Sequence, residues 1–383
     1  MKNWKATGLK WTLAASMAVT AILPLTYSAP PTYAADAVVS KVEVVKRLPM
    51  VQVIATGGTI AGQSVDETSF TKYRSGTLLV EDMVAALPNK DQIADVSSYQ
   101  FGNSGSSAYT IEQLYDLSKA VDEALKTQDG VVVTTGTDTM EEIAYFLDLT
   151  VRSPKPVVIT GSMRPWTVIG SDAQANLYNA IKLAASGKTK YFGTVLMLND
   201  EFHAAREVTK ANSYRTDTFV SPGVGSLGHI DGDMIRVYRA PFRAMKYGGQ
   251  WATPFDLNKI GKEELAKVEI AYSYQDAGAG AISGFAKAGA DGIVTAGTGA
   301  GGISRAMSEE RKQAIEEGVI FVSTTRTGSG SNYSSGEGII GGDNLNPAHA
   351  RIMLLLSLSF SENFDTIKGW FETYGYGQVE ARK

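Results

Sequence analysis

Short runs rich in valine and isoleucine alternate along this chain with segments whose apolar residues recur at helical spacing. Such alternation is typical of β–α–β units, in which a helix connects two parallel strands of one sheet. It therefore predicts an α/β protein with mainly parallel sheets. In the first part of the chain the expected strands are Met50–Ala55, Val131–Thr134, Val157–Thr160 and Val195–Leu198, and the expected helices are Thr110–Leu125, Thr139–Leu149 and Asp172–Ala185.

Two of these helices begin with the pattern of a capping box. In this arrangement a threonine side chain and a glutamine or glutamate three residues later each bond the other's backbone N–H group. The pairs here are Thr110 with Gln113 and Thr139 with Glu142. We therefore expect both helices to begin directly after these threonines.

The alternation of strand and helix patterns stops after about residue 200 and resumes near residue 268. Residues 212–256 are rich in glycine, proline and aromatic residues, which predicts hairpins and turns. We expect a larger N-terminal α/β domain over residues 35–250, a linker over 251–267 that is a connection rather than a packed element, and a smaller C-terminal α/β domain over 268–383. The expected strands of the second domain are 268–274, 292–296 and 319–324, and its expected helices are 281–288, 304–317, 347–358 and 363–374.

The first 34 residues have the composition of a signal peptide. Lys2, Lys5 and Lys10 precede an apolar run over Trp11–Leu25, and small residues around Ala34 fit a cleavage site. We expect cleavage near Ala34 and a secreted protein, extracellular or periplasmic. An uncleaved N-terminal anchor is the alternative, although the apolar run is short for a membrane span.

Composition removes several kinds of chemistry. The chain has no cysteine, so disulfides, thiolate catalysis and thiolate-bound metals are all excluded. The net charge of −4 and the lack of a basic run after the leader argue against nucleic acid and anionic membranes as partners. The three histidines are scattered in the sequence, which makes a histidine-based metal site or a Ser-His-Asp triad a poor expectation.

Ligands of open parallel sheets bind beyond the carboxyl ends of the strands, and the turn after the first expected strand has an unusual composition. Paired glycines at Gly57 and Gly58 allow close backbone approach and can direct amide N–H groups at a developing oxyanion. Thr59 follows them and can present its hydroxyl to the same space. The alternative interpretation is a tight strand-to-helix turn in which Thr59 is only a helix cap.

A second turn follows the strand 131–134 and carries Gly136, Thr137, Asp138 and Thr139. Capping of the next helix explains part of this string. A carboxylate beside several hydroxyls can also bind an ammonium group and orient water, and we favour that function. Lys210 lies in a polar stretch, where a lysine is usually solvated. Beside Asp138 it can instead pair with the carboxylate and transfer a proton.

A third turn contains Gly297, Gly299 and Gly302, which match the dinucleotide fingerprint G-x-G-x-x-G. A single match is a weak indication. The next strand ends in serine and threonine, with no acidic residue to bind a ribose, and the turn lies late in the chain. A dinucleotide-dependent dehydrogenase therefore stays a remote alternative.

Together these strings closely resemble the bacterial type II L-asparaginase family over nearly the whole chain after the leader. Residues 54–62 (Ile-Ala-Thr-Gly-Gly-Thr-Ile-Ala-Gly) resemble the first motif of that family, and residues 136–142 (Gly-Thr-Asp-Thr-Met-Glu-Glu) resemble the second. Their order and separation make the resemblance specific. Three further strings support it, namely Gly161–Pro165, Asp172–Ala180 and Leu345–Arg351.

The resemblance implies hydrolysis of the side-chain amide of L-asparagine, without metal or cofactor, by a homotetramer whose subunits share sites. Thr59 is implied as the nucleophile, and Tyr73 as a residue of a mobile lid within 63–77. Thr137, Asp138 and Lys210 are implied as a second catalytic group. Glu337 is the candidate acidic residue lent to a neighbouring subunit. The implied substrate-binding residues are Gly58, Ser106, Ser107, Gly136, Thr137 and Asp138.

Two alternatives to a specific asparaginase stay open at this point. A broader glutaminase-asparaginase shares every motif named above, and a non-catalytic amino-acid-binding protein is a more remote possibility. The base that activates Thr59, whether Tyr73 or Lys210 paired with Asp138, is also open.

Three features depart from the family pattern. Ser107 stands where glutamine or glutamate is common, Gly302 stands where an asparagine or serine often reaches from the neighbour, and the loop 327–342 is shorter than usual. We expect these differences to shift the selectivity between asparagine and glutamine, with unknown sign.

Overall fold

The computed structural model describes residues 47–246 and 251–377, and the expected signal peptide lies outside them. An eight-stranded sheet forms the N-terminal part, in the order β12-β11-β8-β7-β6-β5-β1-β4. Its five parallel strands are β4 (Asp95–Ser104), β1 (Met50–Gly57), β5 (Gly130–Thr134), β6 (Val157–Thr160) and β7 (Thr194–Leu198). These strands confirm the expected parallel α/β architecture.

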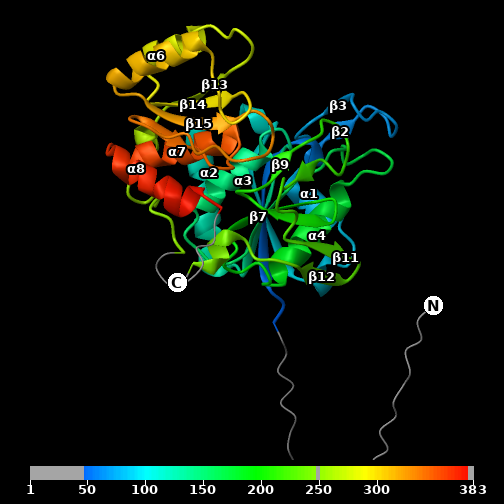
Figure 1. Ribbon diagram of the computed structural model, residues 1–383. Coiled ribbons are helices and arrows are strands. Elements are labelled where there is room, and N and C mark those ends of the chain that lie inside the picture. Colours follow the sequence, from blue (N-terminus) through cyan, green and yellow to red (C-terminus); the bar gives the residue numbers. More distant parts are fainter. Residues whose placement is uncertain (1–46, 247–250, 378–383) are drawn as a thin grey trace, which may run out of the picture. The chain divides into compact units, whose positions relative to one another are not determined.

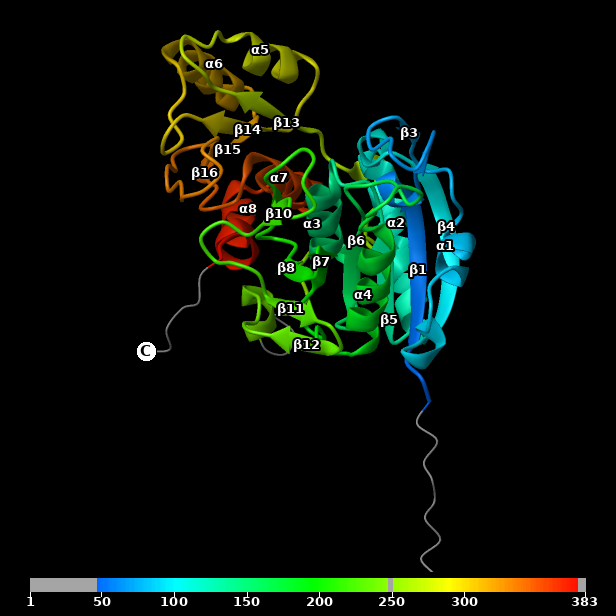
Figure 2. The same cartoon turned by 90° about the vertical axis from the view of Figure 1, so that its right-hand side faces the viewer.

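Helices cover both faces of this sheet (Figures 1 and 2). On one face lie α1 (Val80–Ala85) and α4 (Ala173–Ala185), and on the other lie α2 (Ile111–Thr127) and α3 (Met140–Thr150). Because successive strand residues point to opposite faces, Val53 belongs to the core under α4 and Ile54 to the core under α2 and α3. Burial on both faces explains why β5 is an unbroken apolar run.

Three antiparallel strands extend the sheet beyond β7. They are β8 (Glu201–Ala204), β11 (Gly228–Asp231) and β12 (Met234–Val237). Of these, β11 and β12 belong to the region predicted as hairpins and turns. Two short antiparallel pairs lie outside the main sheet, one of β2 (Gln63–Ser64) with β3 (Tyr73–Arg74) and one of β9 (Thr209–Lys210) with β10 (Phe219–Val220). Both short pairs hold residues of the candidate site.

The C-terminal part is a separate four-stranded parallel sheet. Its strands, in spatial order, are β13 (Val268–Tyr272), β14 (Gly292–Gly297), β15 (Ile320–Thr325) and β16 (Ile339–Gly341). The helices α5 (Gly280–Lys287) and α6 (Arg305–Glu316) cover one face, while α7 (Pro347–Phe360) covers the other and also packs on α3. The chain continues into α8 (Phe364–Trp370) and a π-helical turn, η7 (Phe371–Gly375).

The segment predicted as an unpacked linker is packed instead. Phe255 is fully buried, and its ring lies 5.4 Å from that of Trp370 in an edge-on contact. Leu257 is also buried in the core shared by α2, α3 and α7. The segment therefore joins the two sheets through apolar contacts, a role that its few apolar residues did not indicate.

The two predicted capping boxes have different outcomes. The box of Thr110 and Gln113 is present at the start of α2. The box of Thr139 and Glu142 is wrong, because Thr139 is the N-cap of α3 but its side chain makes no capping bond. Its backbone lies at φ −120° and ψ 20°, outside the extended region from which an N-cap side chain reaches the first turn.

Among the residues described here, no helix combines the length and apolar character that crossing a membrane requires.

Candidate active site

The candidate site lies where the parallel sheet changes its direction of winding. The chain runs from β1 to its neighbour β4 on one side and then returns to β5 on the other side. In open α/β sheets such a switch point leaves a crevice at the carboxyl ends of the two central strands. The turns that follow β1 and β5 here are the two threonine-bearing turns of the sequence analysis.

These two turns touch each other. Gly58 has φ +83°, and a Cβ atom placed on it would lie 2.3 Å from the backbone nitrogen of Gly136. Only glycine combines this backbone conformation with so close an approach. The contact brings the segments of Thr59 and Thr137 to one place, although they are far apart in sequence.

The Thr59 hydroxyl pairs with the phenol of Tyr73. Thr59 Oγ1 lies 2.8 Å from the Tyr73 hydroxyl, and either group can donate the hydrogen bond. Tyr73 comes from β3, and its ring packs against Gly62, where a Cβ would lie 2.9 Å from the ring. The structure therefore brings the predicted nucleophile and the predicted lid tyrosine together.

The hairpin that carries Tyr73 is attached to the body of the protein by backbone bonds. Gly76 N–H donates to Gly58 O at 3.1 Å, and Trp166 N–H donates to Gly62 O at 3.1 Å. The hairpin tip is organised by Asp66, whose pKa is lowered by hydrogen bonds from the side chains of Thr68 and Ser69. Movement of this hairpin as a lid stays a prediction.

Lys210 lies beside the second turn rather than in solvent. Its ammonium group donates to Asp138 Oδ1 at 2.7 Å and to Thr137 Oγ1 at 2.9 Å. The side chain of Lys210 is 15% exposed and that of Asp138 is 75% exposed, so the carboxylate faces open space while the lysine is covered. Pairing of β9 with β10 places Lys210 opposite the buried Phe219 and fixes its backbone.

Ser106 and Ser107 differ in their surroundings. Ser106 is buried, and its hydroxyl accepts a hydrogen bond from the backbone N–H of Thr139 at 3.1 Å. Ser106 therefore occupies the Thr139 N–H group that the predicted capping box assigned to the Glu142 side chain. Ser107, one residue further, is exposed.

The structure does not bring Glu337 to the other predicted site residues of the same chain. It is exposed and precedes β16, next to Gly338, whose carbonyl accepts from Phe321 N–H near the start of β15. It thus lies at the amino edge of the C-terminal sheet, whereas Gly297 and Gly302 lie at the carboxyl edge. Its predicted role in a neighbouring subunit stays a prediction.

The glycine turn considered for a dinucleotide is closed on itself. Thr298 N–H donates to Gly302 O at 2.7 Å, and Gly302 N–H donates back to Thr298 O at 2.7 Å. Backbone amides that cradle a pyrophosphate must point outward, and these two do not. Among the described residues, no cluster of three or more histidine, aspartate or glutamate side chains is arranged to hold a metal ion.

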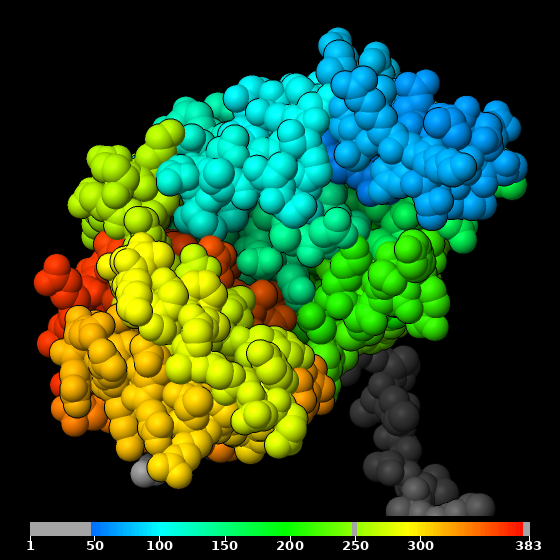
Figure 3. All heavy atoms as spheres, turned by 90° about the horizontal axis from the view of Figure 1, so that it is seen from above, coloured from blue at the N-terminus to red at the C-terminus, as the bar shows by residue number. Residues whose placement is uncertain are grey.

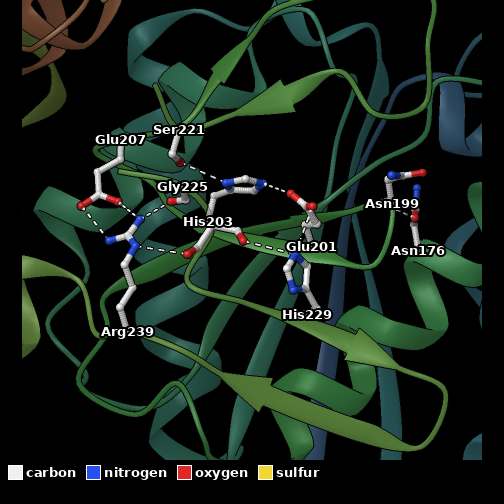
Figure 4. A network of polar contacts seen from close by, with 10 residues as sticks. Asn176, Asn199, Glu201, His203, Glu207, Ser221, Gly225, His229 and Arg239 are labelled. Carbon is white, nitrogen blue, oxygen red and sulfur yellow. Dashed lines mark hydrogen bonds and ion pairs between the residues drawn. The ribbon is translucent and has the colours of Figure 1, made fainter. Parts of the chain in front are cut away.

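Two of the histidines, although scattered in the sequence, are close in space. Figure 4 shows Glu201 between His203 and His229, with His229 Nε2 at 3.0 Å and His203 Nε2 at 3.4 Å from the carboxylate. Ser221 Oγ lies 3.0 Å from His203 Nδ1. Burial lowers the pKa of His203 to about 4, which makes it a weak base at neutral pH, and Ser221 is itself buried.

Sequence reasoning missed Glu141 beside the second turn. It is the second residue of α3, and burial raises its pKa to about 7. It lines a cavity of 390 Å³ together with Thr209, Tyr272 and Arg326. Figure 3 shows the surface from above, where yellow and orange atoms of the C-terminal part border green atoms of the N-terminal part. The Glu141-Glu142 pair in the second motif is the signal that was available in the sequence.

Comparison with known families agrees with this architecture. The family described as Asparaginase, N-terminal, matches residues 50–243, and the Glutaminase/Asparaginase C-terminal domain matches residues 267–371.

Known proteins show the same similarity over most of their length. L-asparaginase 2 of Bacillus subtilis is 41% identical over 86% of this chain and 88% of its own. A glutaminase-asparaginase of Acinetobacter glutaminasificans is 34% identical over 85% of this chain and 99% of its own. The crystal structure of a probable cytoplasmic L-asparaginase from Campylobacter jejuni superposes with a TM-score of 0.81 at 36% identity, over 85% of this chain and all of that one. With both of its parts matched in order and relatives above 30% identity along nearly their whole length, the chain belongs to the asparaginase family.

Proposed function

We propose that this protein hydrolyses L-asparagine to L-aspartate and ammonia, with Thr59 as the nucleophile. The single observation that carries the proposal is the pairing of two threonine hydroxyls with proton-transferring groups at one switch point. Thr59 pairs with Tyr73, and Thr137 pairs with Lys210 and Asp138. Family membership supports the same reaction class, because relatives at 34–41% identity are named asparaginases or glutaminase-asparaginases.

The reaction follows from a hydroxyl that is a poor nucleophile until a neighbour takes its proton. Thr59 Oγ1 attacks the amide carbon while its proton passes through the Tyr73 hydroxyl to the departing nitrogen, which leaves as ammonia. The resulting ester is then opened by water, which regenerates the threonine hydroxyl. Backbone N–H groups of the glycine-rich turns stabilise the oxyanion in both steps.

The second group binds and orients in this scheme. The exposed carboxylate of Asp138 accepts the substrate α-ammonium, while Ser106 and Ser107 bind the α-carboxylate. Lys210 keeps Thr137 hydrogen-bonded and supplies a positive charge beside the forming oxyanion. Gly58 and Gly136 supply the narrow backbone surface between the two threonines.

Removal of each threonine hydroxyl tests the proposal. We expect Thr59→Ala to lower kcat for ammonia release from asparagine on the order of 10³-fold or more, the scale of losing a nucleophile. Thr137→Val should lower it on the order of 100-fold or more. Thr71→Val, an exposed threonine of the Tyr73 hairpin, is the matched control and should be silent. Tight asparagine binding without turnover by the wild type would favour the amino-acid-binding alternative.

Selectivity between the two amides separates an asparaginase from a broader glutaminase-asparaginase. We expect a higher kcat/KM for asparagine than for glutamine. We also expect Gly302→Asn and Ser107→Gln to change this ratio, because the first adds a side chain and the second lengthens one at positions where the family commonly carries them. An unchanged ratio in both variants would contradict the proposed role of these positions.

We also propose that the protein is exported and forms a homotetramer with sites shared between subunits, to which Glu337 contributes. The relatives differ in their named location. One from Haemophilus influenzae is named a probable periplasmic asparaginase, which agrees with export, and the Campylobacter protein is named a probable cytoplasmic one. Mass spectrometry of secreted material checks cleavage near Ala34. Sedimentation velocity checks the tetramer.

A further inference from the structure

Two of the family-like strings, residues 161–165 and 172–180, have no role in the candidate site so far, and one side chain joins them. Asp172 is the N-cap residue of α4, but its carboxylate makes no capping bond to that helix. Its two oxygens instead accept hydrogen bonds from the backbone N–H groups of Met163 and Arg164, both at 3.0 Å. Asp172 therefore fixes the first half of residues 161–170, the anchor loop, which follows β6.

Asn176, one turn further along α4, fixes the start of the same loop. Its buried amide donates through Nδ2 to Asp172 Oδ2 at 2.9 Å and to Gly161 O at 3.0 Å. Gly161 packs against the second threonine turn, since a Cβ atom placed on it would lie 2.5 Å from Thr135 O and 3.5 Å from Thr137 Cγ2. The anchor loop thus begins at a fixed place beside the candidate site.

The second half of the anchor loop is bonded to the hairpin that carries Tyr73. Three hydrogen bonds join the loop to the first strand of the hairpin and to the residues on either side of it. These bonds run from Trp166 N–H to Gly62 O at 3.1 Å, from Ser64 N–H to Thr167 Oγ1 at 2.9 Å and from Ile169 N–H to Glu67 O at 2.9 Å. Ser64 is also the residue that pairs with Tyr73 between β2 and β3. Thr167 therefore holds the residue directly opposite Tyr73.

The hairpin has little of its own to fix its position. None of residues 63–75 is buried, and a pair of two-residue strands contributes little stability by itself. The hydrogen bonds that reach residues 63–72 from the rest of the described chain come from Thr167 and Ile169 of the anchor loop. The place of the Tyr73 hydroxyl, 2.8 Å from Thr59 Oγ1, therefore depends on that loop.

We propose that Asp172 is a positioning residue for the hydrolysis, which holds the anchor loop so that the loop keeps the Tyr73 hydroxyl on Thr59. The proposal rests on the proposed function, because it supports the contact that transfers the proton there. Asp172 acts through Thr167 and Ser64 and does not touch the reacting atoms.

The test interrupts this connection at its two ends. Asp172→Asn is isosteric, but it replaces an oxygen that accepts a backbone N–H by an amide nitrogen, which cannot accept one. Thr167→Val removes the acceptor of Ser64 N–H and leaves α4 unchanged. Asp122→Asn is the matched control for the first variant. Asp122 on α2 accepts Arg152 N–H at 2.9 Å, in the connection that enters β6 at the amino edge of the sheet.

Hydrogen–deuterium exchange measures the connection without any activity. We expect the amides of residues 63–72 to exchange at least about tenfold faster in Asp172→Asn and in Thr167→Val than in wild type, because the hairpin is then free to open locally. Asp122→Asn should exchange like wild type in this segment, and so should Thr71→Val, the hairpin control. Exchange at the wild-type rate in Thr167→Val would overturn the connection, even if Asp172→Asn failed to fold.

Kinetics test whether the connection acts through Tyr73. We expect Asp172→Asn to lower kcat for asparagine about 10- to 100-fold with less than about a threefold change in KM, since a misplacement of about 1 Å costs on the order of 100-fold. Thr167→Val should lower kcat about 3- to 10-fold, and Asp122→Asn should stay within about twofold of wild type. In a Tyr73→Phe background, which lacks the hydroxyl to be positioned, Asp172→Asn should lower kcat by less than about twofold, because coupled residues are not additive.

Two kinetic outcomes would overturn the positioning role. The same fold loss of kcat from Asp172→Asn in wild type and in Tyr73→Phe would show a general structural effect. Wild-type kcat in both Asp172→Asn and Thr167→Val would show that the hairpin keeps Tyr73 in place by itself. A folded wild type that releases no ammonia would instead contradict the proposed function, and exchange of residues 63–72 would still decide whether Asp172 holds the hairpin.

Discussion

Gly58 is the residue on which the site geometry depends most. It adopts φ +83°, and an added Cβ would lie 2.3 Å from Gly136 N and 2.4 Å from Gly136 Cα. Both neighbours are backbone atoms of the second turn, so neither can move without displacing Thr137. The two threonine turns therefore share one narrow contact that admits no side chain.

Gly58→Ala tests this contact. We expect it to lower the free energy of unfolding by about 3 kcal/mol or more, from about 1–2 kcal/mol of left-handed strain and at least as much from the collision. It should also abolish asparagine hydrolysis. Gly223→Ala is the matched control, because its φ is +80° but nothing lies within 4 Å of the added Cβ. If urea unfolding gave both variants the same loss in the free energy of unfolding, the backbone at Gly136 would have shifted to accommodate the added Cβ.

Individual residues of the candidate site were predictable from sequence to different degrees. Thr59, Thr137 and Asp138 lie directly after strands, and their turn composition indicated a site at the carboxyl edge. Lys210 lies more than 70 residues from Asp138, so its position depends on β9 and β10, whose two-residue strands leave no periodic pattern. Glu141 was hidden for a related reason, since its hydrogen-bond partner Asn346 lies at the start of α7.

At the level of elements, helix starts show how local pattern and tertiary contact compete. The capping box of Thr110 formed because its partner Gln113 lies in the same first turn. At Thr139 the backbone N–H is taken by Ser106 from another segment, and the side chain is left without a capping bond. The sequence around a helix start does not reveal a hydrogen bond to that start from a residue distant in sequence.

Two alanine substitutions measure this difference. Thr110→Ala should lower the free energy of unfolding by about 1 kcal/mol, the usual cost of a lost N-cap. Thr139→Ala should change it by less than about 0.5 kcal/mol, because its hydroxyl makes no cap bond. Urea unfolding of both variants beside wild type checks the pair. A larger loss at Thr139 would mean that its side chain does cap α3 in solution.

Strand prediction from sequence failed where burial was one-sided or absent. The edge strand β4 has the sequence Asp-Val-Ser-Ser-Tyr-Gln-Phe-Gly-Asn-Ser and contains no fully buried residue, so it lacked the apolar run that revealed β1 and β5. Its pairing is set by β1, with Met50 beside Asp95. Edge strands need only one partner, which leaves their composition free.

For the whole described molecule, the two sheets share a core rather than meeting through a flexible linker. One continuous cluster contains Phe146 of α3, Phe255 of the connection, Val294 of β14 and Leu354 of α7. The alternation of strands and helices predicted both sheets, because each β–α–β unit is local. It did not predict their docking, which depends on which face of α7 meets α3.

The pH dependence of the stability of the whole molecule depends on buried groups whose pKa values are shifted in opposite directions. Burial lowers the pKa of His203 to about 4 and that of His349 to about 3, both from 6.5. Between pH 6.5 and 4.5 these rings bind protons in the unfolded chain only, so stability falls as the pH falls. Glu141 has its pKa raised from 4.5 to about 7, so in the window from 7 to 4.5 it binds a proton in the folded state only. Its contribution grows as the pH falls and opposes that of the histidines.

Glu141→Gln should therefore make the protein more sensitive to acid. Each such group changes the slope of stability against pH by about 1.4 kcal/mol per unit. From pH 7.5 to 4.5 the variant should lose about 3 kcal/mol more than wild type, which keeps the opposing protonation of Glu141. Glu123→Gln, at a carboxylate 71% exposed beside Lys126, should follow the wild-type curve within about 0.5 kcal/mol. Urea unfolding at several pH values and one protein concentration gives both curves. Parallel curves for Glu141→Gln and wild type would mean that Glu141 is already ionised below pH 5, and hydrogen bonding to the carboxylate would then outweigh burial.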